Sequence, residues 1–259
     1  MTHVIATVWF WTFMVITSVL LFPIAALIRL LSFPFDRQLV MLHRFTSFWG
    51  SLYTWCNPLW SVTIEGTEHL SRSIPHVIVA NHQSFADILV LFRLRFHYKW
   101  VSKAENFRVP LIGWNMTLNR YIRLDRGSVR GNLQMMRKCE EALQGGSSVM
   151  IFPEGTRSPD GELRPFKDGA FDLALRTHSP ILPIAIDGTA EALPKRGILL
   201  QGKRRIRVHI LPALVPSVVE HMSAKELNRA TWQRIYDALA SLRRGREGRG
   251  SSGEVHQTA

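Results

Sequence analysis

An uncharged apolar run near the start of the chain constrains its fold most. No residue from position 4 to position 28 carries a charge, and Val, Ile, Leu, Phe and Trp dominate the run. As a helix, this run would be roughly 37 Å long, against about 30 Å for the hydrocarbon core of a bilayer. A signal peptide would need a basic start and a shorter run, whereas only Met1, Thr2 and His3 precede this one. The run therefore predicts a membrane helix.

Two arrangements of this membrane segment are open. Its length favours a helix that spans the bilayer, whereas Pro23 allows a pair of shorter helices that lie in the interface. Basic residues follow the run but do not precede it, so the positive-inside rule places the rest of the chain on the cytoplasmic side: Arg29, Arg37 and Arg44. Aromatic residues come next, either at headgroup level or packed in a core: Trp49, Tyr53, Trp55 and Trp60. We assign residues 1–58 to a membrane-anchoring region.

From about residue 60, short apolar runs alternate with helical patterns, which is typical of an α/β domain with a mainly parallel sheet. Most of the runs are continuously apolar, as in a sheet covered on both faces. The predicted strands are Trp60–Ile64, Val77–Ala80, Lys99–Ser102, Tyr121–Leu124, Ser148–Phe152, Ile181–Ile186 and Ile206–Leu211. The predicted helices are Phe85–Leu94, Val129–Leu143, Gly169–Arg176 and Ala224–Leu242. Residues 59–242 form this domain, and residues 243–259, which lack an apolar face, are expected to be a disordered basic tail.

The chain is strongly basic, with 32 Lys and Arg, 20 Asp and Glu and a net charge of +12. Nucleic acid, an acidic protein or an anionic membrane surface could attract this charge. The sequence has no recognisable nucleic-acid motif, so we expect membrane lipids and no nucleic acid as partners. Cys56 and Cys139 are too few for a disulfide scaffold or a four-cysteine zinc site, and we expect both to be buried packing residues. We predict no metal site.

The first stretch that can carry chemistry directly follows the predicted strand Val77–Ala80. His82 lies beyond this strand, at the sheet edge where ligands of open α/β sheets bind. On one regular helix, His82 and Asp87 would point about 140° apart. They can meet only if His82 lies in the turn before the helix and Asp87 in its first turn, with Ser84 as the N-cap. Asp87 would then bind one ring nitrogen and leave the other as a base. The alternative is that both residues are structural.

The second stretch, Phe152–Ser158, also follows an apolar strand. Gly155 allows a positive φ, and adjacent backbone N–H groups together with the Arg157 guanidinium would form a cradle for phosphate. Taken alone, such a loop can equally be an ordinary turn.

Together, these stretches resemble the glycerolipid acyltransferases, in particular the 1-acylglycerol-3-phosphate acyltransferases. The first family motif, Asn-His-x-Ser-x-x-Asp, is matched by Asn81, His82, Ser84 and Asp87. The third, Phe-Pro-Glu-Gly-Thr-Arg-Ser, is matched in full by Phe152–Ser158, and the short fourth by Leu182–Ile184. Two further runs fit the family: Lys103, Glu105, Pro110 and Gly113, and then Phe166, Lys167 and Gly169. The second motif, Gly-x-x-Phe-Ile-x-Arg, fits less well, because Arg126 is in place but Arg120 and Arg123 replace its Gly and Phe.

The resemblance implies a glycerol-3-phosphate-acyltransferase-like α/β sheet flanked by helices, preceded by a membrane helix or a two-helix membrane motif. It implies acyl transfer from acyl-CoA or acyl carrier protein to the free sn-2 hydroxyl of lysophosphatidic acid, which makes phosphatidic acid without a cofactor. His82 would be the base, and Asp87 would orient it. The acceptor and its phosphate would be bound by Glu154, Gly155, Thr156, Arg157, Lys103 and Arg126. Within this set, Glu154 would orient Arg157 or an acceptor hydroxyl.

The expected location is the cytoplasmic face of a membrane, which in a bacterium is the inner membrane. Two alternatives are open. The acceptor could be another lysophospholipid or a lyso-aminolipid. The chain could also be a membrane-bound lipid-binding or scaffold protein that keeps the fold without turnover.

Overall fold

The apolar runs pair into one seven-stranded sheet with the order β1-β7-β6-β2-β5-β3-β4. The fold is that of a computed structural model, which describes residues 2–195, 197–219 and 221–251. Neighbouring strands are parallel except β6 and β7, which pair antiparallel. The strands are β1 (Trp60–Glu65), β2 (Val77–Ala80), β3 (Tyr98–Lys103), β4 (Ile122–Leu124), β5 (Ser148–Ile151), β6 (Ile181–Asp187) and β7 (Arg204–Ile210).

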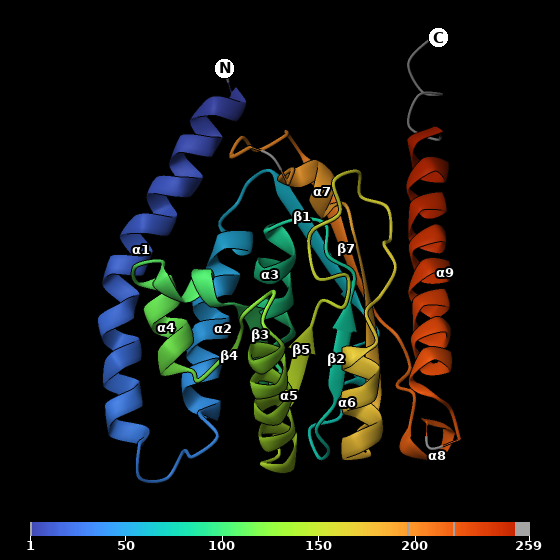
Figure 1. The fold of residues 1–259 in the computed structure, drawn as a ribbon. Helices are drawn as coiled ribbons and strands as arrows, with labels where there is room; N and C mark the ends of the chain where they lie inside the picture. Colours follow the sequence, from blue (N-terminus) through green and yellow to red (C-terminus); the bar gives the residue numbers. More distant parts are fainter. Residues whose placement is uncertain (1, 196, 220, 252–259) are drawn as a thin grey trace.

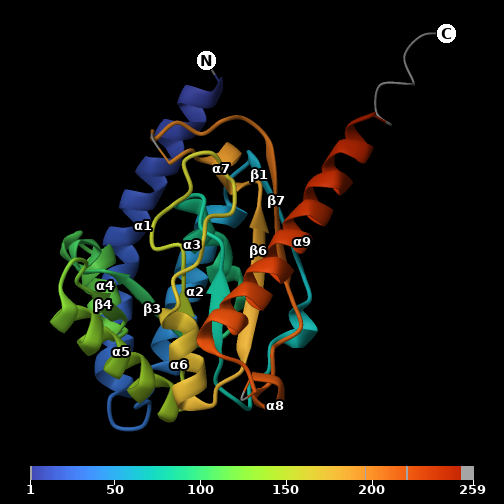
Figure 2. The same ribbon diagram turned by 45° about the vertical axis from the view of Figure 1, so that its right-hand side comes forward.

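Helices cover both faces of this sheet (Figure 1). The longer ones are α1 (Thr2–Ser32), α2 (Val40–Trp55), α5 (Val129–Gln144), α6 (Gly169–Thr177) and α9 (Ala224–Ser251). The short ones are α3 (Ala86–Leu91), α4 (Ile112–Leu118), α7 (Thr189–Ala192), α8 (Pro216–Val219) and the 3-10 turns η1 (Thr67–His69), η2 (Phe92–Leu94) and η3 (Ala104–Arg108). Figure 2 shows α9 crossing the sheet in front of β6, which it contacts.

The central strand β2 shows why the strand runs are continuously apolar. Ile78 and Ala80 belong to the core shared with α1, α2 and α3, whereas Val77 and Val79 belong to the core shared with α5, α6 and α9. All four side chains are fully buried. The predicted α/β class, the seven strands and the four helices after residue 60 are confirmed to within a few residues, except that α9 continues further.

The residue pattern did not predict helix α2, although the family resemblance implied a two-helix motif as one alternative, because polar residues interrupt its buried face. His43 bonds through its two ring nitrogens with the Tyr121 hydroxyl and the Phe96 carbonyl, at 2.9 and 3.0 Å. Thr46 accepts a hydrogen bond from the side-chain amide of Asn119 at 2.9 Å. Helix prediction relies on an apolar stripe, and in α2 the stripe formed by Leu42, Trp49 and Tyr53 is interrupted by these hydrogen-bonded polar side chains.

Helix α1 is long and apolar enough to cross a membrane. Pro23 lies inside it and does not break it, so the alternative of two shorter helices is wrong and the single helix is confirmed. One face of α1 packs on α2 and α4, beside which it runs in Figure 1, while most of its other side chains are exposed. Of the aromatic residues that follow, Trp55 is exposed and the other three are buried in the core: Trp49, Tyr53 and Trp60.

The predicted disordered tail is wrong for residues 243–251. Helix α9 continues to Ser251, so the backbone of residues 243–251 is helical, and residues 252–259 lie outside the described residues. Arg243 ties this part of α9 to the domain, because its guanidinium contacts Glu162 at 2.8 Å and Asp187 at 3.7 Å. Charged contacts with distant residues stabilise a segment whose sequence offers no apolar face. Cys56 is a second correction, since it is exposed, whereas Cys139 is buried as expected.

Candidate functional site

The predicted site residues lie at one edge of the sheet. Because β2, β5, β3 and β4 are mutually parallel, their carboxyl ends lie at the same edge. His82 follows β2, Phe152 follows β5, Lys103 ends β3 and Arg126 follows β4. Residues that are far apart in the sequence are therefore collected at one edge by strand topology alone.

His82 and Asp87 meet in the arrangement that their spacing requires. His82 lies in the turn before α3, and Asp87 lies in the first turn of α3. The Nδ1 atom of His82 is 2.8 Å from Oδ2 of Asp87. The same oxygen accepts the backbone N–H groups of Gln83 and Ser84, at 2.6 and 2.8 Å. Since an ionised carboxylate only accepts, Nδ1 carries the proton and Nε2 is left as a base.

Burial and stacking fix the histidine ring. The Asp87 side chain is fully buried, whereas the His82 side chain is 15% exposed and so reaches the surface. The His82 ring stacks on Phe152, with centroids 4.0 Å apart and planes at 9°. Phe152 in turn stacks on Trp100, at 5.6 Å and 29°. The hydrogen bond to Asp87 and the stacking on Phe152 together restrict rotation of the His82 ring.

Two other residues of the first motif hold the backbone. The Asn81 side chain accepts from Ile186 N at 2.8 Å and donates to Ile186 O at 2.9 Å, which joins β2 to β6 beyond their last strand pair. The Ser84 hydroxyl is buried, donates to the Leu193 carbonyl and accepts from Ala86 N at 3.1 Å. Ser84 was predicted to be the N-cap of α3, but Phe85 occupies that position, and the Ser84 hydroxyl instead closes a local turn. Both hydrogen bonds of this hydroxyl are to backbone groups.

The loop Phe152–Ser158 turns sharply at Gly155. Gly155 N donates to Phe152 O at 3.1 Å, and its φ is +74°. A Cβ at this position would lie 3.0 Å from Nζ of Lys167. This lysine is exposed and lies beside the turn, and Lys195 donates to the Arg157 carbonyl. The sequence analysis assigned no role to either lysine. The only sequence signal for Lys167 was its place in the run Phe166, Lys167 and Gly169, which matches the family.

Glu154 joins the two motif loops. Its carboxylate accepts from His82 N at 2.7 Å and from Arg164 N at 3.3 Å. Ser158 N donates to His82 O at 2.8 Å, so the loops are connected in both directions. Burial of the side chain raises the pKa of Glu154 from 4.5 to about 7, although these two N–H donors lower it. We expected Glu154 to orient Arg157 or an acceptor hydroxyl, and instead both of its oxygens are bonded to backbone N–H groups.

The basic residues of the site differ in exposure. Arg157 is half-buried, whereas Lys103 and Arg126 are exposed. Lys103 pairs with Leu124 in the sheet, which brings it close to Arg126. Partial burial lowers the pKa of the Arg126 guanidinium, and nearby Glu105 opposes that shift. The carboxyl end of the sheet therefore carries cationic side chains as well as His82, an arrangement that suits an anionic ligand. Within residues 2–195, 197–219 and 221–251, no cluster of His, Cys, Asp and Glu could hold a metal ion.

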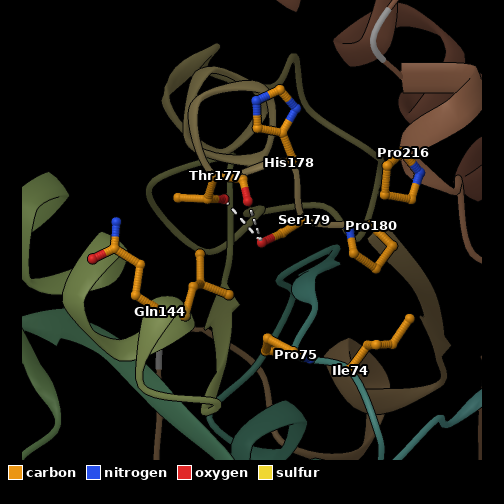
Figure 3. A pocket seen from close by; sticks show the side chains of 9 residues that line it. Ile74, Pro75, Gln144, Thr177, His178, Ser179, Pro180 and Pro216 are labelled. Atoms are coloured by element: carbon orange, nitrogen blue, oxygen red, sulfur yellow. Dashed lines mark hydrogen bonds between the residues drawn. The ribbon is translucent and has the colours of Figure 1, made fainter.

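A cavity of about 260 Å³ lies at the opposite edge of the sheet (Figure 3). It is lined by residues that precede β2 and β6, including Pro75 and Pro180. Figure 3 shows Thr177 and Ser179 joined by hydrogen bonds, one of 2.9 Å between their hydroxyls. Its lining includes one imidazole, that of His178, and no carboxylate, so it lacks a His–Asp pair like that of His82 and Asp87.

Comparison with known proteins agrees with this geometry. The model of the family described as Acyltransferase matches residues 61–187, a stretch that includes both loops. The chain is 41% identical over 179 residues to the 1-acyl-sn-glycerol-3-phosphate acyltransferase BAT2, chloroplastic, of Brassica napus, covering 68% of this chain and 52% of that protein. It is 37% identical over 202 residues to LPAT1, chloroplastic, of Arabidopsis thaliana, with 76% and 54% covered. Residues 61–187 belong to the family described as Acyltransferase.

The acyltransferase chain spans about half the length of these two curated relatives. Its fold matches the crystal structure of the 1-acyl-sn-glycerophosphate (LPA) acyltransferase PlsC from Thermotoga maritima. That match has a TM-score of 0.78, with 22% identity, and covers 93% of this chain and 96% of the other. The predicted family and the predicted α/β fold are thereby confirmed.

Proposed function

We propose that this acyltransferase moves a fatty acyl group from a thioester to the free sn-2 hydroxyl of 1-acylglycerol-3-phosphate, forming phosphatidic acid. The observation that carries the proposal is the His82–Asp87 pair, 2.8 Å apart at the carboxyl edge of the sheet. The names of the curated relatives support the choice of acceptor. The cationic residues around the pair support a phosphate-bearing substrate.

In this mechanism, Nε2 of His82 removes the hydroxyl proton while the hydroxyl oxygen attacks the thioester carbonyl. Asp87 holds the ring and stabilises the imidazolium that forms. The tetrahedral intermediate then collapses with cleavage of the C–S bond, and the imidazolium returns the proton to the departing thiolate. The products are phosphatidic acid and a free thiol, and His82 is neutral again.

The transfer is direct and needs no acyl-enzyme or cofactor. Ser84 is the hydroxyl nearest in sequence to the base, but it is buried and its proton is donated to the Leu193 carbonyl. Its backbone setting also lacks the Gly-x-Ser-x-Gly elbow of serine hydrolases. The thioester is carried by coenzyme A or by acyl carrier protein.

We assign the acceptor phosphate to the loop Gly155–Arg157, with Lys103 and Arg126 beside it. The fork of Arg157 suits two phosphate oxygens, whereas the N–H groups of Gly155 and Ser158 are already bonded to Phe152 O and His82 O. Glu154 acts on this site through the backbone, because it fixes His82 N relative to the loop. It is therefore a positioning residue in this proposal.

We further propose that α1 lies in the plane of one membrane leaflet, on the cytoplasmic side, rather than crossing the bilayer. Its contacts with the domain extend along the helix: Trp11 Nε1 donates to Ile198 O at 2.8 Å, and Phe22 packs on Trp114 at 5.7 Å. A helix held along its length by a polar domain cannot cross a bilayer alone. The Trp11 ring also stacks on Phe85, three residues from His82. The exposed apolar face of α1 would thus bring acyl chains close to the base.

The decisive test is an acyl-transfer assay of purified protein with acyl-CoA or acyl-carrier-protein donors and lysophosphatidic acid. His82→Ala should abolish turnover, and His69→Ala, at a histidine on η1 away from the site, should not. A folded His82→Ala protein with wild-type turnover would show that the mechanism is wrong.

The acceptor is tested separately. Arg157→Ala should raise KM for phosphate-bearing acceptors far more than the control Arg72→Ala, a change on an exposed loop. Mass spectrometry of the products from a panel of lysophospholipids and lyso-aminolipids identifies the preferred acceptor. A preference for an acceptor other than lysophosphatidic acid would change the substrate while leaving the chemistry intact.

A further inference from the structure

A cavity of about 510 Å³ lies at the start of β3, β4 and β5, the opposite end of these strands from His82. Five basic side chains line it: Arg37, Lys99, Arg120, Arg123 and Lys138. Lys99 is the second residue of β3 and Lys103 is the last, so at about 3.3 Å per residue they are about 13 Å apart. The part of the cavity around Lys99 is therefore separate from the site of the proposed acyl transfer, while Arg123 and Phe107 extend its lining toward the other end of β4.

The floor of this cavity holds a buried cation. Lys99 is only 6% exposed, and its ammonium donates to the carbonyls of Gln38 and Asn119, at 2.8 and 2.9 Å. An ammonium carries three N–H donors, so one remains for a ligand in the cavity that Lys99 lines. Burial, and after it the charge of Arg120, lowers the pKa of Lys99 to about 8, although the nearby Asp36 carboxylate opposes this shift. A bound anion would relieve both effects.

Arg120 reaches the cavity from an unfavourable backbone conformation. Its φ is +52°, in the left-handed region where glycine is favoured and side chains are strained. The second family motif carries a glycine at this position, so an arginine here adds strain that the motif residue avoids. This conformation closes the C-terminus of α4, where Tyr121 N donates to Met116 O at 3.0 Å, and the arginine adds a charge at the cavity in a place where glycine would fit without strain.

The charges around the cavity are poorly balanced. The acidic residue of its lining, Glu141, pairs with Arg137 at 3.3 Å, outside the lining. In the part of the chain that the structure describes, Arg37, Arg120 and Lys138 form no ion pair. Gathering cations in this way raises their mutual repulsion unless an anion is bound among them.

We propose that this cavity is a second binding site, for a phosphate-bearing anion such as a phosphomonoester or a diphosphate. The apolar part of the wall, which includes Phe107 and Tyr121, would contact the group that carries the phosphate. The volume exceeds what one phosphate needs and lies within the usual range for a small-molecule site. The anion is either a soluble compound or the headgroup of a lipid, since the segment leading to Arg37 exposes Phe33 and Phe35.

Protection of Lys138 from chemical acetylation tests the proposal, because Lys138 is exposed and lines the cavity. The probes are sodium pyrophosphate, phosphatidylglycerol vesicles and phosphatidylcholine vesicles. Mass spectrometry compares acetylation of Lys138 with that of Lys225, an exposed lysine of α9. Lys138 should be protected several-fold and Lys225 unchanged. Protection by pyrophosphate identifies a soluble ligand, whereas protection by phosphatidylglycerol vesicles alone identifies a lipid headgroup.

Arg120→Gly separates a built site from a general surface charge. Its apparent Kd for the protecting probe should be at least tenfold weaker, since a charged hydrogen-bond partner is lost. Without ligand, the variant should melt about 2–4 °C higher, because glycine removes the backbone strain. Arg157→Ala should leave protection of Lys138 intact. Equal labelling of Lys138 with and without every probe, or undiminished protection in Arg120→Gly, would overturn the proposal whatever the outcome of the acyl-transfer assay.

Discussion

Replacing Asp87 by asparagine removes the negative charge behind His82 while keeping its shape. In the native protein, Oδ2 of Asp87 accepts from the His82 ring, Gln83 N and Ser84 N. An asparagine oxygen in that place can accept from the same three donors. The opposite orientation would set an NH₂ group against two backbone N–H donors, so the structure favours the first. The ring therefore keeps its tautomer in Asp87→Asn.

The magnitude follows from this geometry. A hydrogen bond to a charged group contributes about 1.5–3 kcal/mol, against about 0.5–1.5 kcal/mol for a neutral pair. Loss of the charge should therefore destabilise the imidazolium of the transition state by about 1–2 kcal/mol. At 1.36 kcal/mol per tenfold change in rate, the chemical step should slow about 5- to 30-fold. A lost tautomer would cost far more, on the order of 10⁴ in a comparable triad.

Single-turnover acyl transfer with saturating lysophosphatidic acid measures the chemical step without product release. Asp87→Ala is the companion variant, because it removes the acceptor of all three hydrogen bonds and should be both slower and less stable. A rate for Asp87→Asn within twofold of wild type would show that the charge is not used. A loss above about 1,000-fold at unchanged stability would show that the ring has changed tautomer and that the inferred hydrogen-bond pattern is wrong.

Three further predictions concern burial and backbone conformation. The pKa of Glu154 is about 7 in the folded protein and 4.5 in the unfolded chain, so its ionisation lowers the free energy of unfolding by about 3 kcal/mol as the pH rises between these values. In urea unfolding, the free energy of unfolding of Glu154→Gln relative to wild type should therefore rise by that amount from pH 4.5 to pH 7.5. An equal difference between the two proteins at both pH values would contradict this. Gly188 has a φ of +87°, and a Cβ there would lie 2.2 Å from a backbone carbonyl oxygen, whereas a Cβ at Gly127, with a φ of +85°, would meet no atom within 4 Å. Gly188→Ala should therefore lower the free energy of unfolding by about 2–4 kcal/mol and Gly127→Ala by about 1 kcal/mol. Equal melting temperatures of the two variants would refute the steric argument. Cys56 is exposed, while burial raises the pKa of Cys139 to about 12, so a thiol reagent should modify Cys56 in the native protein and Cys139 only after unfolding; rapid modification of both would contradict the burial of α5.

Much of the candidate site could be predicted, because its chemistry is local in the sequence. His82 and Asp87 lie within one strand–turn–helix unit, and parallel strands bring that unit to the edge where the Phe152–Ser158 loop begins. The role of Glu154 could not be predicted. Its partners are the backbone N–H groups of His82 and Arg164, and a sequence pattern does not show which distant amide a carboxylate will meet.

The same distinction holds for the rest of the fold. Seven strands were predictable because continuous apolar runs between turn residues leave few alternatives. Helix α2 was not predictable from its own pattern, since polar residues on its buried face find their partners in Tyr121, Phe96 and Asn119. The end of α9 was not, since Arg243 finds Glu162 and Asp187 only in the folded chain.

The apolar run at the start of the chain shows the division most clearly. By itself, the sequence determined that residues 4–28 form an apolar helix long enough to cross a bilayer, because hydrophobicity and the absence of charge are properties of the segment alone. Only the tertiary structure decided that this helix runs unbroken through Pro23 and rests along the domain. That decision depends on pairs such as Trp11 with Ile198 and Thr7 with Leu200, which are nearly two hundred positions apart and meet only when the sheet has formed.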